Sequence, residues 1–406
     1  MPRKLLLALA LVLFSLVAFS AAAHAQSPYL STGSWSNPVG PLSSCPSGFD
    51  TPGMTCYTTT VSCPDPYNPG HNIADLGVTY GYEAPPTGTP YIGTIVMFPG
   101  GPGTSPATAI NEIQFIQHYK GLGYEMIQLS WDEAWEDVNF PIPPDTFGNI
   151  QTAACRQATF LSFVHSSTTI SSQTPVILWQ PGPTAGFCAQ GSSAGSAAIA
   201  YAMTWYGAAD ATTGFLDNVE LLAGPPLSRV DAGCFQSPSG PWPNVDVCDP
   251  SNGGIGACQG WPSPHGISLS PTYQFPAYNG VRQWTNVAAC AETSGGTSPW
   301  NGVWDNMSIV SPTVTTQQKT YPKTSVGAWL CDTSTGAMNN TTPEGYLYYQ
   351  AISPLSTAFT VNAIYNCDGP EGVANGYDIP NTQDPKHEGI TLIEKDMQNR
   401  CIARHQ

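Results

Sequence analysis

Three serines lie close together in the stretch GFCAQGSSAGSAAIAYAMTWYG, which spans residues 186–207. Ser193 stands at the centre of GSSAG (191–195), a G-x-S-x-G pattern. This pattern is typical of a sharp turn from a strand into a helix, where only small residues fit at both ends and the central serine is exposed as a nucleophile. An ordinary small-residue turn is the competing interpretation. The predicted strand before GSSAG and the alanine-rich helix after it favour Ser193 as the nucleophile, with Ser192 and Ser196 as its neighbours.

A serine that attacks a carbonyl needs backbone N–H groups to stabilise the oxyanion. Ala194, the residue after the nucleophile, can supply one of them. The predicted buried strand GTIVMF (93–98) runs into PGGPG (99–103), where Gly100 or Gly101 can supply another, because a backbone without side chains lets the substrate approach. Pro102 has no N–H to donate. Taken by itself, this segment fits a Gly-Pro turn that closes a strand equally well.

Together, the glycine turn after a buried strand, GSSAG after a later strand, and an acid and a histidine near the C-terminus resemble the α/β-hydrolase superfamily. FPGGPG (98–103) is similar to the HGGPG turn of proline iminopeptidase-like members, with Pro99 in place of the histidine. Where those members carry D-x-R-G-x-G, this chain has SWDEAWED (130–137), which argues against aminopeptidase activity. The resemblance covers most of 77–227 and 356–406.

This resemblance implies a serine, acid and histidine in that chain order, with the base near the C-terminus. His387, in the loop DPKHEGI, is the predicted base, and His405, the penultimate residue, is the alternative. The acid is expected in the loop after the penultimate strand, where Asp368 follows a predicted strand and orients the histidine. Other acids compete for this role: Glu371, Asp378, Asp384 and Asp231.

The positions around these residues predict an α/β fold. Strand and helix signals alternate from residue 77 to residue 227, which implies parallel βαβ units, and they resume at 356–367 and 388–405. Residues 26–75 are interpreted as a cysteine-containing N-terminal extension. Residues 228–350, with five cysteines and six of the 11 tryptophans, are interpreted as an inserted lid or cap, so that 76–227 and 351–406 form the hydrolase core.

Composition indicates the compartment of the protein and excludes some classes of partner. Residues 1–25 have a basic start, an apolar run and Ala-His-Ala, the pattern of a secretory signal cleaved after Ala25. Its removal takes away Arg3 and Lys4 and changes the formal net charge from −16 to −18, which disfavours nucleic acid and anionic lipid as partners. All 12 cysteines follow the signal, which indicates disulfides in an exported protein. No cofactor, no metal and no membrane span are predicted for the mature chain.

The sequence therefore predicts a secreted serine hydrolase that cleaves carboxylic esters. Export and the tryptophan-rich insert favour an extracellular polymer or its fragments, such as esterified polysaccharide, polyester or lipid. A secreted serine peptidase of the same fold is one alternative. A non-catalytic protein that uses its tryptophans to hold glycans is another.

Overall fold

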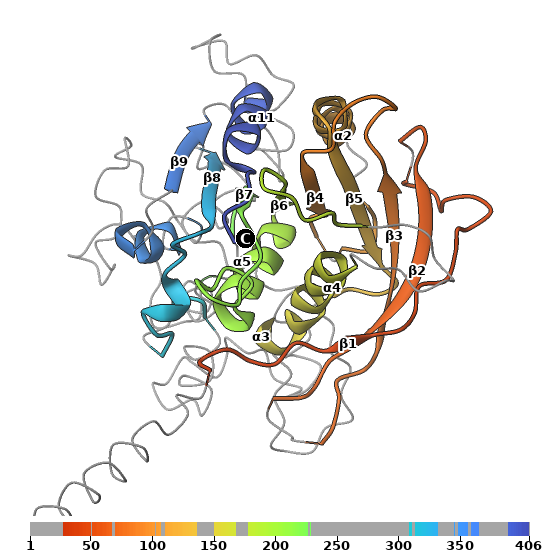
Figure 1. The fold of residues 1–406 in the computed structure, drawn as a ribbon. Coiled ribbons are helices and arrows are strands. Elements are labelled where there is room, and N and C mark those ends of the chain that lie inside the picture. Colours follow the sequence, from red (N-terminus) through yellow and green to blue (C-terminus); the bar gives the residue numbers. More distant parts are fainter. Residues whose placement is uncertain are drawn as a thin grey trace, which may run out of the picture.

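A nine-stranded sheet forms the centre of the chain (Figure 1). The computed structural model describes residues 27–49, 51–66, 70–101, 103–106, 110–135, 150–167, 178–225, 228, 308–310, 313–331, 345, 348–355, 359–364 and 389–405. The strands lie side by side in the order β1-β2-β3-β5-β4-β6-β7-β8-β9. In chain order they are β1 (Ser34–Trp35), β2 (Thr55–Ser62), β3 (Leu76–Glu83), β4 (Gly93–Phe98), β5 (Tyr124–Trp131), β6 (Gly186–Ser192), β7 (Asn218–Leu222), β8 (Ser325–Cys331) and β9 (Phe359–Ile364).

The six strands from β4 to β9 are all parallel to one another. Strands β1, β2 and β3 continue the sheet beyond β5 through antiparallel pairs. Because parallel strands end at the same side of a sheet, the segments that follow β4, β6, β7, β8 and β9 all start from one side. We call this side the carboxyl edge. It is where a ligand site of an open α/β sheet is expected.

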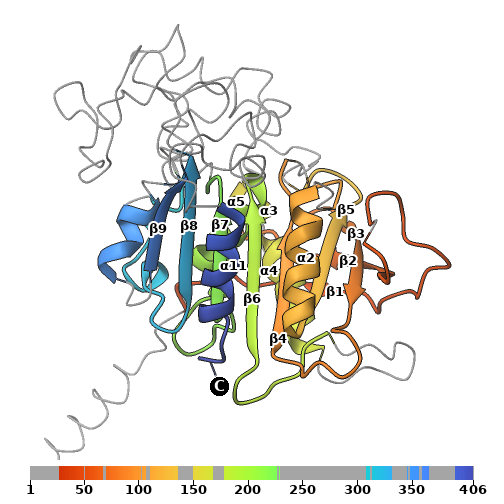
Figure 2. The same cartoon turned by 90° about the horizontal axis from the view of Figure 1, so that it is seen from above.

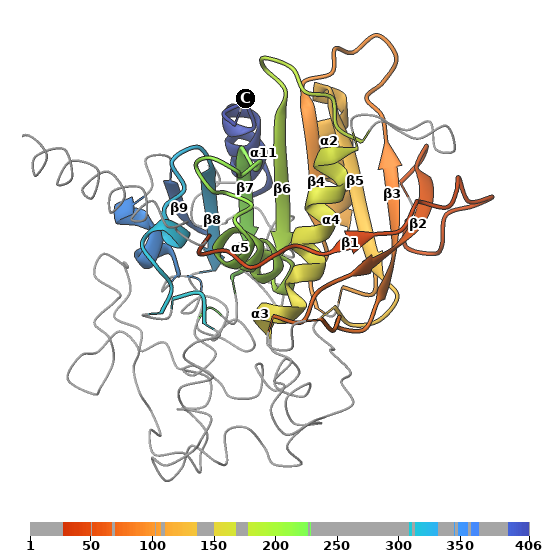
Figure 3. The same ribbon diagram turned by 60° about the horizontal axis from the view of Figure 1, so that its bottom comes forward.

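Helices cover both faces of the sheet. Figure 2 shows α2 and α11 over one face, and Figure 3 shows α3, α4 and α5 over the other. Their bounds are α2 (Ile110–Leu122), α3 (Ile150–Ala153), α4 (Cys155–Ser166), α5 (Ala194–Tyr206) and α11 (Gly389–Arg400). The described elements also include two short 3-10 helices, η3 (Gln317–Lys319) and η4 (Ser353–Leu355). The α/β fold predicted from the alternating strand and helix signals is confirmed.

The central strands and α5 explain why the sheet needs two helical layers. Every residue of β4 is buried, as expected for the apolar run GTIVMF between two neighbouring strands and two helical faces. Helix α5 is buried along its whole length, and its small alanine side chains let it lie close to the sheet. It ends at Gly207, whose φ of 70° is the left-handed conformation that commonly terminates helices.

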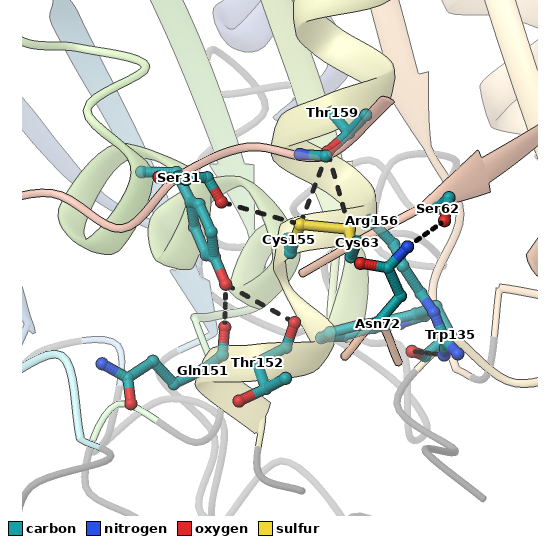
Figure 4. Close-up of a disulfide and its surroundings, with 12 residues drawn as sticks. Ser31, Ser62, Cys63, Asn72, Trp135, Gln151, Thr152, Cys155, Arg156 and Thr159 are labelled. Carbon is teal, nitrogen blue, oxygen red and sulfur yellow. Dashed lines mark hydrogen bonds between the residues drawn. A yellow bond between two sulfur atoms is a disulfide. The ribbon is translucent and has the colours of Figure 1, made fainter. Parts of the chain in front are cut away.

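Three disulfides tie distant segments to this framework. Cys45–Cys56 closes a short loop beside β2, and Cys63–Cys155 joins the end of β2 to the start of α4 (Figure 4). Cys188–Cys401 joins β6 to the segment directly after α11. The predicted disulfide framework is confirmed for these six cysteines, and it is consistent with an oxidising compartment.

Two expected boundaries need correction. Residues 26–75 are not outside the core, because β1 and β2 are strands of the main sheet and seven residues of β2 pair with β3. Residues 228–350 are not wholly an insert either, because β8 lies between β7 and β9. Trp329, which we counted with the insert, is a buried residue of β8 whose indole Nε1 donates to Glu220 Oε2 over 2.6 Å. The other tryptophans of that stretch lie outside the described residues.

The last predicted helix is also shorter than expected. The periodic pattern indicated 388–405, whereas α11 ends at Arg400. The chain turns there, because Cys401 is bonded to Cys188 and the following residues bind the amino ends of other strands.

Candidate active site

Ser193 occupies the turn between β6 and α5, at the carboxyl edge. Its φ of 51° and ψ of −119° lie in a region that non-glycine residues rarely adopt. Such strain persists only where the surrounding structure enforces it, and it is typical of functional sites. The turn has the conformation expected of a nucleophile elbow, in which a strained serine stands where a strand turns sharply into a helix. The Ser193 residue is 9% exposed.

The two glycines of GSSAG are required by close backbone contacts. A Cβ on Gly191 would lie 2.5 Å from the backbone carbon and oxygen of Gly195. A Cβ on Gly195 would in turn collide with the carbonyl oxygens of Phe98 and Pro99. The elbow is therefore folded on itself and pressed against the end of β4. Only small residues therefore fit at both ends of the pattern.

Hydrogen bonds fix the elbow on both sides. The Ser193 N–H donates to the carbonyl oxygen of Leu222, at the end of β7, over 2.8 Å. The Ser193 carbonyl oxygen accepts from the Ser196 hydroxyl at 2.6 Å and from the Ser196 N–H at 2.9 Å. Ser196 is thus a residue that stabilises the first turn of α5, and its hydroxyl is not directed to a substrate.

The glycine turn after β4 lies beside the elbow. Phe98, the last residue of β4, pairs with Gly191 of β6. Within the turn, the Gly103 N–H donates to the carbonyl oxygen of Gly100 over 3.3 Å, and Gly101 has a φ of 59°. A Cβ on Gly101 would meet no described atom within 4 Å.

Ala194 is placed to act together with this turn. It is the first residue of α5, and the first N–H groups of a helix have no partner within the helix. The positive end of the helix dipole also favours negative charge at this position. The structure thus places Ser193 and Ala194 at the carboxyl edge beside the end of β4, where the turn with Gly100 and Gly101 begins.

His405 lies at the opposite edge of the sheet and cannot serve as the base. Its backbone N–H donates to Asp217 Oδ1 over 3.0 Å, and its Nε2 lies 3.2 Å from the hydroxyl of Thr324. Both partners come directly before strands β7 and β8, at their amino ends. Burial lowers the pKa of His405 to about 4, so this imidazole is neutral and structural at ordinary pH. His387 lies outside the described residues.

The sheet order changes the expectation for the acid. The strand before Asp368 is β9, which is the last strand of the sheet and not the penultimate one. The penultimate strand is β8, and the residue that follows it in sequence is Asp332. The sequence alone places this residue in an insert, because the strand before it has no clear strand pattern. Asp332, Asp368 and the other acids considered (Asp231, Glu371, Asp378 and Asp384) lie outside the described residues.

Sequence reasoning also gave no role to the tryptophans of SWDEAWED (130–137). Trp131 ends β5, and both Trp131 and Trp135 are buried against the glycine turn. Their spacing of four residues at the end of a predicted strand was the only signal available in the sequence.

In the described part of the chain, no group of three or more His, Cys, Asp or Glu side chains is arranged to hold a metal ion. No described helix has the length and apolar character needed to cross a bilayer.

Several solved esterases are similar to this chain at low sequence identity. A bacterial heroin esterase is 12% identical, with 86% of this chain and 85% of the other covered, at a TM-score of 0.44. A fungal esterase from Rhizomucor miehei is 11% identical, with 84% of each chain covered, at a TM-score of 0.45. A carboxyl esterase from Tuber melanosporum is 11% identical over 86% and 87% of the two chains, at a TM-score of 0.43. No protein-family model and no curated protein sequence matches the chain.

The order and direction of the strands identify the fold. Six parallel strands follow an antiparallel start, the strand order reverses between β4 and β5, and a strained serine sits between a central strand and its helix. These features show that the chain has the α/β-hydrolase fold.

Proposed function

We propose that this protein is a secreted serine hydrolase that cleaves carboxylic esters through an acyl-enzyme intermediate. The observation that carries the proposal is the strained Ser193, held at a helix N-terminus beside the glycine turn. A small-residue turn without a catalytic role has no need of a serine at a φ of 51°, where glycine would fit without strain.

The reaction proceeds in two steps. The Ser193 hydroxyl oxygen attacks the ester carbonyl while His387 takes its proton, and the N–H groups of Ala194 and of Gly100 or Gly101 bind the oxyanion. The tetrahedral intermediate then expels the alcohol, which receives the proton from His387. Water, activated by His387, attacks the acyl-enzyme and releases the acid and the free serine.

The acid that orients His387 has two candidates. Asp368 follows β9, the strand after which His387 also comes, whereas Asp332 directly follows β8. Since neighbouring strands lie about 4.8 Å apart, β8 is about 10 Å from β6 and β9 is about 14 Å away. The shorter distance favours Asp332. Separate Asp332→Asn and Asp368→Asn variants decide between them, because only the true partner lowers kcat by about 10²-fold or more.

The substrate class follows from the compartment. A secretory signal, three disulfides and a strongly acidic chain favour an uncharged extracellular ester, such as an esterified polysaccharide, a polyester or a lipid. An uncharged ester needs no basic side chain to bind it.

The test is an assay of the mature protein and of its Ser193→Ala variant on short-chain nitrophenyl esters and on aminoacyl anilides. We expect turnover of the esters, loss of at least about 10³-fold in kcat with Ser193→Ala, and little turnover of the anilides. Ser192→Ala is the matched control and should keep most of the activity. A preference for anilides would identify a peptidase, and inactivity on both substrates would leave glycan binding without catalysis.

A further inference from the structure

Two buried tryptophans hold the end of the glycine turn. The Gly103 carbonyl oxygen accepts from the backbone N–H of Trp131 over 2.8 Å. A Cβ on Gly103 would lie 2.8 Å from Trp131 Cδ1 and 3.1 Å from Trp135 Cδ1. Both indoles are buried, so neither can move aside easily. Gly103 is therefore enclosed by a backbone hydrogen bond on one side and two rings on the other.

Arg156 of α4 holds the backbone of Trp135 by a hydrogen bond. Its Nη1 donates to the Trp135 carbonyl oxygen over 2.7 Å, and its Nη2 donates to the carbonyl oxygen of Ala74 over 3.0 Å. Figure 4 shows the Arg156 side chain directed from α4 toward Trp135. Arg156 is 2% exposed, and charge-assisted hydrogen bonds of a buried guanidinium are strong and strongly directional. The guanidinium thereby ties together α4, the segment after β5 and the segment before β3.

These contacts form a continuous path to the oxyanion donors. Arg156 holds Trp135, Trp135 and Trp131 enclose Gly103, and the Gly103 N–H closes the turn on Gly100. Gly100 and Gly101 are the residues proposed to bind the oxyanion. The path reaches these donors without contacting Ser193.

We infer that Trp131, Trp135 and Arg156 are positioning residues that fix the glycine turn so that its N–H group points to the oxyanion; this rests on the ester hydrolysis proposed above. Oxyanion donors act because they are oriented before the reaction begins. A turn that ends in flexible glycines cannot hold that orientation alone, since glycine restricts its backbone least. The rings and the guanidinium supply the missing rigidity.

A double-mutant cycle between Gly103→Ala and Trp131→Leu tests the contact. Gly103→Ala pushes a methyl group against Trp131 and also strains a backbone with a φ of 75°. Each single variant should lower kcat about 10- to 100-fold with KM changed less than about 3-fold, because the donor is misplaced in the transition state. The double variant should lose less than the product of the two single losses, because Trp131→Leu removes the ring that the new methyl group meets.

Trp179→Leu is the matched control. Trp179 is also a buried tryptophan, but it stacks on His165 near Phe187, at the amino end of β6. The Trp179→Leu variant should lose as much stability as Trp131→Leu and keep the kcat of the wild type. Trp131→Phe, which retains a ring, and Arg156→Lys, which retains the charge but can serve only one carbonyl well, should give intermediate losses.

A second measurement does not depend on activity. Amide hydrogen exchange in residues 99–104 should be faster in Trp131→Leu than in the wild type, and unchanged in Trp179→Leu. Single losses that multiply in the double variant, a kcat of Trp131→Leu equal to that of Trp179→Leu, or unchanged exchange in residues 99–104 would overturn the inference. Wild-type protein without ester turnover would overturn the proposed function instead, and the exchange result alone would then decide whether the tryptophans hold the turn.

Discussion

At the scale of single residues, the site depends on places where only a hydrogen fits. Gly195 has no space for a Cβ because the carbonyl oxygens of Phe98 and Pro99 already occupy it. A glycine has no comparable role at Gly121, an exposed position of α2 where a Cβ would meet no described atom within 4 Å. A backbone contact thus requires a glycine at position 195, whereas no described contact requires one at position 121.

We therefore predict opposite effects for the same substitution. Gly195→Ala should lower the free energy of unfolding by about 1–3 kcal/mol and abolish most ester turnover, because the elbow must move away from β4. Gly121→Ala should raise the free energy of unfolding by about 0.5–1 kcal/mol and leave turnover unchanged. Urea unfolding and an ester assay measure both. A fully active Gly195→Ala would show that the elbow does not need this contact.

A buried carboxyl group gives the stability a pH dependence. Glu125 of β5 is 1% exposed, and burial raises its pKa to about 8. The unfolded chain ionises this group near its ordinary pKa of about 4.5, whereas the folded chain keeps it protonated. The stability that Glu125 contributes is therefore complete below pH 4.5 and is lost as the pH rises toward 8.

Glu125→Gln, which stays neutral, should not suffer this loss. Relative to the wild type, the variant should gain about 2–4 kcal/mol in the free energy of unfolding between pH 5 and pH 8.5. Its amide can still accept the hydrogen bond that the Tyr82 hydroxyl donates to this side chain over 3.3 Å. Urea midpoints across this range measure the difference, and a difference that is the same at both pH values contradicts the assignment.

At the scale of elements, the sequence predicted β4 to β7 and α5 well but missed β2 and β8. The first group has apolar runs or clear periodicity. In TCYTTTVS, four of the eight residues are threonines, and this polar composition concealed a strand of the main sheet. In SVGAWLC, Gly327 interrupts the apolar run because the Glu220 carboxylate of β7 occupies the place of its Cβ. This reason lies in the neighbouring strand, so the local sequence could not reveal it.

The missed strand also explains the uncertain acid. The positions of Ser193, Ala194 and the glycine turn were predictable because these residues follow strands that the sequence shows plainly. The predicted position of the acid depends on counting strands from the C-terminal side. Because β8 was not recognised in the sequence, the expected acid moved from Asp332 to Asp368.

The disulfide between Cys188 and Cys401 should be the most stabilising of the three for its loop length. It connects residues 213 apart and joins β6, which carries Ser193 at its end, to the end of α11. Replacing both cysteines by alanine should cost about 5 kcal/mol, against about 3 kcal/mol for the Cys45–Cys56 pair, which are 11 apart. Guanidinium unfolding of the two double variants tests the order, and equal losses would argue against it.

At the scale of the whole molecule, the N-terminal segment is part of the folded body. The Tyr29 hydroxyl donates to Asp210 Oδ2 over 3.0 Å, and the Leu30 N–H donates to the carbonyl oxygen of Trp205 over 2.8 Å. In Figure 3 this segment runs across α5 and α4 toward β1. These contacts of Tyr29 and Leu30 lie just after the predicted cleavage site at Ala25.

When the full sequence is secreted by a heterologous host, we expect the intact mass of a chain that begins at Gln26. Cleavage there leaves all the contacts of Tyr29 and Leu30 in place. A mature chain that begins beyond Leu30, or one that keeps residues 1–25, would contradict the proposed signal.

The central claim is that Ser193 is a nucleophile, and covalent labelling tests it most directly. The mature protein is treated with a fluorophosphonate, and the site of the adduct is located by mass spectrometry of its peptides. The account predicts one adduct on Ser193 and none in the Ser193→Ala variant, while Ser192→Ala and Ser196→Ala are still labelled. An adduct on Ser192 or Ser196, or no adduct on a folded protein, would contradict it.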